Sequence, residues 1–181
     1  MANVNHSSLT DPYLHEPKGV AAAASGEVYV ANGAGSGAWR FLPHAFCYYT
    51  DVGTGTTIST PISYTKVNPT TTGDPTQKDF THTSPARLTY TGSTTIDANL
   101  FASITIKSSE ASLQGIFFRF YKNGSPHGVE SVTAALSGNY THVSIVDHLE
   151  LATNDYVEVY TKTATGSVVV HSIAIDIKGC V

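Results

Sequence analysis

The stretch Thr95-Ile-Asp-Ala-Asn-Leu-Phe-Ala-Ser-Ile-Thr-Ile-Lys107 decides the fold class of this chain. Every second residue from Ile96 to Ile106 is apolar, and most of the residues between them are polar. Successive side chains of a β-strand point to opposite faces of a sheet, so this period of two predicts a strand with one buried face. The residues on the buried side would be Ile96, Ala98, Leu100, Ala102, Ile104 and Ile106.

The composition favours strands throughout the chain. Thr supplies 24 and Ser 18 of the 181 residues, whereas charged residues make up only 13%. Hydroxyl and β-branched side chains suit the exposed faces of pleated sheets and lose χ1 freedom in helices. Because 41% of the residues are hydrophobic, the chain can build a real core. We therefore expect one all-β domain with an additional arm.

The chain changes character near residue 42, which divides it into an arm, residues 1–42, and a domain, residues 43–181. In the domain, short β-type runs alternate with turn signals. Asn123-Gly124 has the sequence of a hairpin turn, because both residues tolerate positive φ. Eight to ten such strands indicate a β-sandwich. The expected strands are residues 45–50, 57–67, 86–91, 95–107, 113–122, 142–151, 156–162 and 166–178, with a loop over 68–79.

The arm is rich in glycine and alanine and contains one strand-like stretch, residues 27–30. A single short strand is not stable in water, so the arm should become ordered against something else. Trp39, Phe41 and Leu42 would form its hydrophobic anchor point.

The charge and hydropathy of the chain exclude several functions. The formal net charge is −4 and the ten Lys and Arg residues are scattered singly, whereas nucleic-acid binding needs a basic footprint. No apolar run approaches the ~20 residues of a membrane span, and the first ten residues lack the pattern of a secretory signal. We expect no nucleic-acid partner, no membrane insertion, and synthesis in a cytoplasm.

Three kinds of chemistry find no support in the motifs. The glycines within residues 33–37 follow a predicted strand, but a dinucleotide fingerprint needs another spacing and a following helix. His142 and His148 share a strand face but lie about 20 Å apart, too far to bind one ion. His171, on the apolar side of the last strand with Ile173, is typical of a hydrogen-bonded core histidine. Without a catalytic elbow or zinc-protease motif, we expect no enzyme, cofactor or metal.

The later strands resemble the tumour-necrosis-factor-like jelly roll. Residues 116–124 are similar to its F-x-x-Y-x-N-G hairpin, and residues 149–157 to its L-x-L-x-x-G-D-x-V corner. Asn154 stands where the family usually has Gly, and Asn also tolerates the left-handed conformation. The closing strand, residues 168–177, is similar as well. The resemblance covers residues 86–181 and implies a jelly-roll β-sandwich that forms a homotrimer.

The resemblance bears on the positions of the two cysteines. In the jelly roll, the strands that hold Cys47 and Cys180 are antiparallel neighbours, so a disulfide between them is one hypothesis. The alternative is a pair of reduced thiols, because cytoplasmic assembly keeps cysteines reduced. Both interpretations stay open at this stage.

Tyr156 and Tyr160 share the face of their strand that lies opposite its valines. Aromatic faces of this kind suit a trimer interface, because Tyr brings contact area together with a polar group. An exposed sheet face explains the two tyrosines equally well.

Residues 6–39 resemble an N-terminal segment of head decoration and head-fibre proteins of tailed bacteriophages. The resemblance rests on Leu9, Asp11-Pro12, residues 14–20, residues 28–37 and Trp39. It implies an anchor on the virion, with the major capsid protein as partner and the capsid surface as location after synthesis in the bacterial host. The anchoring residues would be Leu14, His15, Glu16, Pro17, Lys18, Val28, Tyr29, Val30 and Trp39.

These observations favour a non-enzymatic capsid decoration (cement) or head-fibre protein. The alternative is a tail-associated receptor-binding module, in which the loops at residues 68–79 or 124–128 would bind a host-surface glycan. Neither loop contains an aromatic residue, which ranks this alternative second. A small enzyme ranks third, because the sequence supplies no catalytic geometry.

Overall fold

The computed structural model describes residues 22–31, 37–51, 53–59 and 62–180. Its contacts divide the chain between Leu42 and Pro43 into two compact units. The expected anchoring residues 14–18 lie outside the described residues. In the described part of the chain, no helix is long and apolar enough to cross a membrane.

The N-terminal unit contains a β-hairpin, in which β1 (Val28–Ala31) pairs antiparallel with β2 (Gly37–Arg40). The expectation of a lone strand is therefore wrong. Tyr29 and Trp39 face each other in the register, and their ring centroids lie 5.5 Å apart, edge to face. A Cβ on Gly37 would lie 2.8 Å from the Tyr29 ring, so the close approach of the two strands depends on this glycine.

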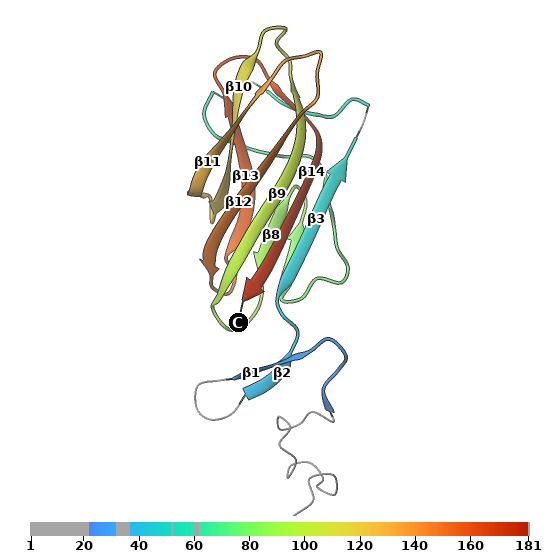
Figure 1. The fold of residues 1–181 in the computed structure, drawn as a ribbon, viewed down its shortest axis with the longest axis vertical. Helices are drawn as coiled ribbons and strands as arrows, with labels where there is room; N and C mark the ends of the chain where they lie inside the picture. Colours follow the sequence, from blue (N-terminus) through green and yellow to red (C-terminus); the bar gives the residue numbers. More distant parts are fainter. Residues whose placement is uncertain (1–21, 32–36, 52, 60–61, 181) are drawn as a thin grey trace, which may run out of the picture. The chain divides into compact units, whose positions relative to one another are not determined.

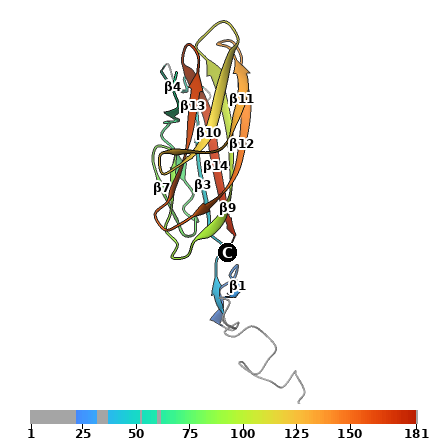
Figure 2. The same cartoon turned by 90° about the vertical axis from the view of Figure 1, so that its left-hand side faces the viewer.

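The second unit is a sandwich of two six-stranded antiparallel sheets, visible as two layers in Figures 1 and 2. We call them the β9 sheet, ordered β12-β9-β14-β3-β6 with β4 beside β14, and the β13 sheet, ordered β11-β10-β13-β8-β7 with β5 beside β13. The all-β sandwich is confirmed. The bounds are β3 His44–Thr50, β4 Thr56–Ile58, β5 Thr65–Lys66, β6 Thr72–Gly73, β7 Phe80–Thr83, β8 Arg87–Tyr90, β9 Ile96–Ser108, β10 Gln114–Lys122, β11 Ser125–Ala135, β12 Thr141–Leu151, β13 Tyr156–Thr163 and β14 Val168–Cys180.

The core fills the space between the two sheets. In β9, burial alternates from Ile96 to Ser108, as the period of two predicted. Side chains from the facing sheet close the core from the other side, with Phe118 and Phe120 almost fully buried. A sandwich buries apolar surface without helices by placing branched aliphatic and aromatic side chains on its two inward faces.

A β-bulge in β14 changes which side of the sheet the side chains point to. The register with β9 shifts between Val170 and Ser172, so that Val168 and Val170 face the core together with Ile173. His171, expected beside Ile173 on the apolar side, is instead the unpaired residue of the bulge, and it is buried. One extra residue in a strand reverses the alternation beyond it, and His171 occupies that position.

The structure contains strands that the sequence pattern did not indicate. β7 and β11 were not expected, the expected loop at 68–79 contains the short strand β6, and the expected strand at 57–67 is two short strands, β4 and β5. Most of the expected loop at residues 124–128 belongs to β11. The hairpin turn is confirmed, because Asn123 and Gly124 both have positive φ, 51° and 75°.

The hypothesis of a disulfide is wrong, because Cys47 and Cys180 are both free. Their strands are antiparallel neighbours, but Cys47 pairs with Ile175, five residues before Cys180. At ~3.3 Å per residue this offset is about 17 Å, whereas bridged cysteines need Cα atoms within ~7 Å. Cys47 faces the core and Cys180 is exposed.

Candidate functional site

The outward face of the β9 sheet carries side chains in rows that cross four strands. The register places each residue beside its partner on the next strand, and side chains of one row share the same face. Three consecutive rows lie two residues apart along each strand. They are Val146-Phe101-Asp176-Phe46, then Ser144-Ser103-Ala174-Tyr48, then His142-Thr105-Ser172-Thr50.

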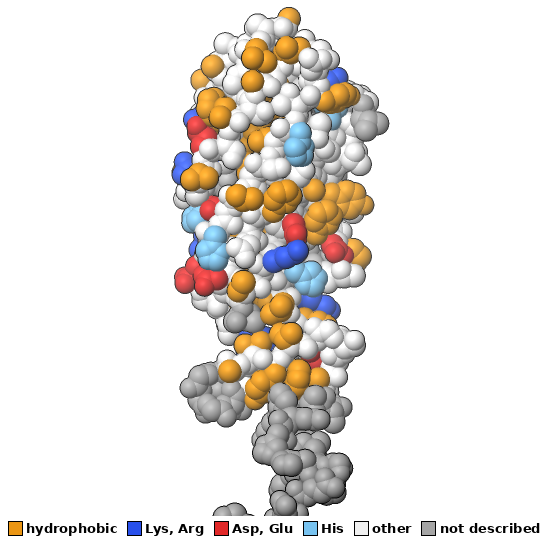
Figure 3. Space-filling view, viewed as in Figure 1, with side chains coloured by type: hydrophobic (Ala, Val, Ile, Leu, Met, Phe, Trp, Pro, Cys, Tyr) orange, Lys and Arg blue, Asp and Glu red, His pale blue; other side chains and the backbone are white. Residues whose placement is uncertain are grey.

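The first two rows expose large apolar side chains. Val146 is 63% exposed, Tyr48 44% and Phe101 43%, and the Phe46 and Tyr48 rings stack at 5.8 Å. Figure 3 shows hydrophobic side chains gathered across this face. We call Phe46, Tyr48, Phe101 and Val146 the apolar patch. Scattered single hydrophobic residues are normal on a protein surface, whereas neighbouring aromatic and aliphatic side chains indicate a docking surface.

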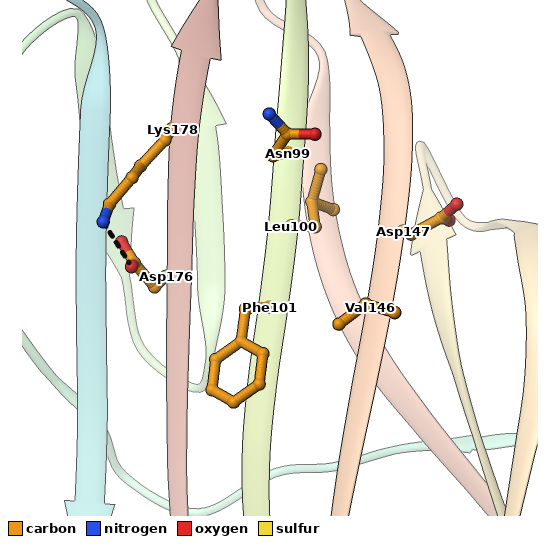
Figure 4. Close-up of a pocket in the computed structure, with 7 residues that line it drawn as sticks. All are labelled: Asn99, Leu100, Phe101, Val146, Asp147, Asp176 and Lys178. Atoms are coloured by element: carbon orange, nitrogen blue, oxygen red, sulfur yellow. Dashed lines mark ion pairs between the residues drawn. The ribbon is translucent and has the colours of Figure 1, made fainter.

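A pocket of about 320 Å³ lies beside the apolar patch. In Figure 4, Phe101 and Val146 lie on adjacent strands, and the Lys178 ammonium contacts the Asp176 carboxylate at 3.5 Å. Asn99 completes the polar part of the lining. Apolar side chains with a polar rim suit contact with another protein surface. No nucleophile paired with a base is present among the lining residues.

Asp147 borders the pocket but is engaged elsewhere. Its Oδ2 lies 2.7 Å from Nδ1 of His127 on β11, and its Oδ1 accepts a hydrogen bond from the His148 amide. A Cβ on Gly128 would collide with this carboxylate, so the strand at this point accommodates only glycine without a shift. The His127–Asp147 pair therefore ties the edge strand of one sheet to the edge strand of the other. Within the described residues, no three His, Cys, Asp or Glu side chains gather as a metal site.

The two tyrosines expected at a trimer interface lie on the other sheet and make contacts within the chain. The Arg87 guanidinium covers the Tyr156 ring at 4.0 Å, and the Tyr160 ring stacks on Tyr121 at 3.8 Å. Both tyrosines are half-buried. Their rings are therefore largely used in stabilising the β13 sheet, whereas the exposed aromatic rings of the apolar patch lie on the β9 sheet.

A buried carboxylate organises this side of the sandwich. Glu158 Oε1 accepts hydrogen bonds from Lys66 Nζ at 2.5 Å and Arg87 Nε at 2.7 Å, and its side chain is only 2% exposed. Burial acts to raise the pKa of this carboxyl, but the two cationic partners outweigh it and hold the pKa below its ordinary value. The ionised Glu158 thus joins β5 and β8 to β13.

Sequence reasoning missed the apolar patch, although a signal was present. Phe101 stands on the polar side of the alternating stretch, between Asn99 and Ser103. Val146 interrupts a polar side in the same way on β12. A large apolar residue on an otherwise polar strand face is the pattern that could have indicated the apolar patch.

The sandwich is a tumour-necrosis-factor-like jelly roll. The chain is similar to the Eiger TNF of S. frugiperda, with a TM-score of 0.55 and 11% identity over 78% of this chain and 94% of that one. It is also similar to murine APRIL (TM-score 0.49, 10% identity, 75% and 98% covered) and to the PRD1 vertex protein P5 (TM-score 0.45, 11% identity, 76% and 96% covered). At these identities the likeness concerns the fold alone. No protein-family model and no curated protein sequence matches the chain.

Proposed function

We propose that this chain is a non-enzymatic structural protein of a tailed-bacteriophage virion, acting as a capsid decoration or head-fibre protein. It would attach to the major capsid protein through its N-terminal unit and expose a trimeric jelly-roll head. The resemblance of residues 6–39 to the N-terminal segment of such proteins supports the assignment, and the jelly-roll fold agrees with it. A cement protein acts mechanically, by bridging neighbouring capsid subunits.

The observation that carries the proposal is the hairpin of β1 and β2. A two-stranded sheet is only marginally stable in water on its own. Tyr29 and Trp39 pack on each other, but Val28 remains 38% exposed and Leu42 45%. Docking on a partner would bury this apolar surface, and addition of a partner strand would supply affinity through main-chain hydrogen bonds.

The apolar patch supports self-association of the head. Self-association through Phe46, Tyr48, Phe101 and Val146 would remove exposed aromatic surface from water at roughly 25 cal/mol per Å². Three hairpins carried by one trimer would then bind the capsid together, so that modest individual contacts give tight attachment. We place the interface on this patch in preference to Tyr156 and Tyr160, whose rings have partners within the chain.

The test is rebinding of purified protein to capsids that have been stripped of it. The full chain should bind, whereas a variant that lacks residues 1–42 and the variant Trp39→Ala should lose binding. Ala38→Ser, an exposed position on the same strand, is the matched control and should bind normally. Failure of the full chain to bind any capsid preparation would refute the capsid assignment.

Light scattering tests the head separately. The wild-type chain should have the mass of a trimer, and Phe101→Lys should dissociate it because the substitution places a charge in the apolar patch. Tyr160→Phe, which keeps the aromatic ring of the other sheet, should remain a trimer. A monomeric wild-type chain would remove self-association from the proposal.

A further inference from the structure

A second pocket, of about 270 Å³, lies at the end of the outward face of the β9 sheet. Its floor is formed by the third row, where Thr105, Ser172 and Thr50 are neighbours in the register of β9, β14 and β3. His171 and Tyr140 complete the lining. Thr105 is four residues along β9 from Phe101, or about 13 Å, and Thr50 is two residues along β3 from Tyr48, or about 7 Å, so this pocket borders the apolar patch on its Tyr48 side.

Three hydroxyl groups lie on the floor of the pocket. Within the described chain, the side chains of Thr50, Thr105 and Ser172 make no hydrogen bond, and none of the three is buried away from the pocket. Three hydroxyls that converge on one hollow can each donate and accept a hydrogen bond. They form a ready set of groups for a ligand that both donates and accepts.

The imidazole of His171 adds a fourth polar group. Its residue is only 5% exposed, and its Nδ1 donates to the Asp51 carbonyl at 3.0 Å. In the neutral ring, Nε2 is then an acceptor, and it makes no hydrogen bond to any described residue. A ligand hydroxyl that reaches the pocket could donate a hydrogen bond to this nitrogen.

Hydrogen bonds join His171 to Asp51, and Asp51 to two glycines that follow it. The Asp51 amide donates to the His171 carbonyl at 2.7 Å, and the Asp51 carboxylate accepts hydrogen bonds from the Gly53 and Gly55 amides. Gly55 has φ of +71°, and a Cβ there would lie 3.0 Å from the His171 ring. Hydrogen bonds of this kind restrain the lining before a ligand binds, and such restraint lowers the entropy lost on binding.

Tyr140 brings an aromatic wall to the pocket. It lies in the loop between β11 and β12, is 52% exposed, and meets the His171 ring edge to face with centroids 4.8 Å apart. The Lys107 ammonium lies 3.8 Å from the Tyr140 ring centroid and steadies the ring. This loop supplies the exposed aromatic residue that the loops at 68–79 and 124–128 lack.

We propose that this pocket binds a single ring of a neutral sugar. Its volume lies below the roughly 300–1,000 Å³ of pockets for drug-sized molecules, which leaves room for one ring. The five lining residues carry no carboxylate or ammonium group, and the nearby Lys107 ammonium is engaged with the Tyr140 ring, so the lining itself offers a charged ligand no counter-ion. Sugar hydroxyls donate and accept as the protein hydroxyls do, and the C–H surface of a pyranose suits an aromatic wall.

In the experiment, the full-length protein is titrated with the methyl glycosides of glucose, galactose, mannose, rhamnose and N-acetylglucosamine. Saturation-transfer NMR measures binding. We expect saturable binding of at least one neutral glycoside, with a dissociation constant on the order of 1 mM. Ser172→Ala and Thr105→Val each remove one hydroxyl and should weaken binding about two- to tenfold. Ser103→Ala, on the same sheet face but outside the pocket, is the matched control and should bind as the wild type does.

Three results would overturn the proposal. The first is that no glycoside shows saturable binding. The second is that the wild type and both pocket variants bind with equal affinity. The third is that methyl glucuronide binds more tightly than every neutral sugar. Circular dichroism of each variant establishes that the sandwich is intact. Because no capsid enters the assay, its failure is separate from failure of the virion assignment.

Discussion

Removing the buried carboxylate of Glu158 should destabilise the sandwich by about 2–3 kcal/mol. The side chain is 2% exposed and accepts hydrogen bonds from Lys66 at 2.5 Å and Arg87 at 2.7 Å. Loss of one partner of a fully buried ion pair costs roughly 3–5 kcal/mol. Here Lys66 and Arg87 keep 23% and 38% of their side-chain surface in water and can rehydrate, so we expect a smaller cost.

The assay is chemical and thermal unfolding of Glu158→Ala and Glu158→Gln beside the wild type. For a chain of this length, about 2–3 kcal/mol corresponds to a fall in Tm of roughly 5–10 °C. Glu158→Gln keeps the side-chain volume and one acceptor oxygen, so it should lose less stability than Glu158→Ala. The matched control is Glu130→Gln, whose ion pair with Lys162 at 2.9 Å is more exposed and should contribute at most about 1 kcal/mol.

The same carboxyl makes a prediction for pH. Its pKa in the folded state lies below the ordinary value of 4.5, so its contribution is fully present above that value and disappears as the pH falls through the folded pKa. The stability difference between wild type and Glu158→Ala should therefore shrink in acid. An Ala variant as stable as the wild type at neutral pH, or a difference that grows in acid, would refute this reasoning.

Three further predictions concern the sandwich. In the native protein only Cys180 should react with a thiol reagent, because burial raises the pKa of Cys47 to about 12. After unfolding without reductant, both thiols should react. Two reactive thiols in the native state would contradict the burial of Cys47. Burial lowers the pKa of His82, so the free energy of unfolding should fall as the pH drops below about 6.5, where the unfolded chain takes up the proton first. In His82→Gln, denaturant unfolding at several pH values should show a weaker dependence of stability on pH. Gly55→Ala should cost about 1–3 kcal/mol in the same assay, because φ is positive there and space is short, whereas Gly138→Ala in an open turn should change stability little.

The strands that could be predicted are those with one buried face. Residues 95–107 were expected and β9 covers Ile96–Ser108, because a half-buried strand imposes its period of two on the sequence. β11 escaped notice because it is an edge strand with exposed residues on both faces, so its sequence shows no alternation. The bulge in β14 was equally hidden: three valines in succession, residues 168–170, fit either parity.

The candidate sites show the same division. Phe101 could have been noticed as an aromatic residue on a polar strand face, but its place in one row with Phe46, with Asp176 between them, depends on register across β14. His171 was expected to be hydrogen-bonded, and it is, to Asp51. That it lines a pocket with Tyr140 follows from a bulge and from a loop more than thirty residues away in the chain. No local pattern encodes such a contact.

The sequence by itself determined the all-β class, the sandwich with its main strands, and the hairpin turn at Asn123. These features are local, since hydrophobic period and turn chemistry act over a few neighbouring residues. Only the tertiary structure decided that Cys47 and Cys180 stay apart, that Tyr156 and Tyr160 are engaged within the chain, and that the apolar patch lies on the β9 sheet. The physical reason is register: which residues face each other across strands is settled by packing of the whole core, and an offset of a few residues changes every such pairing.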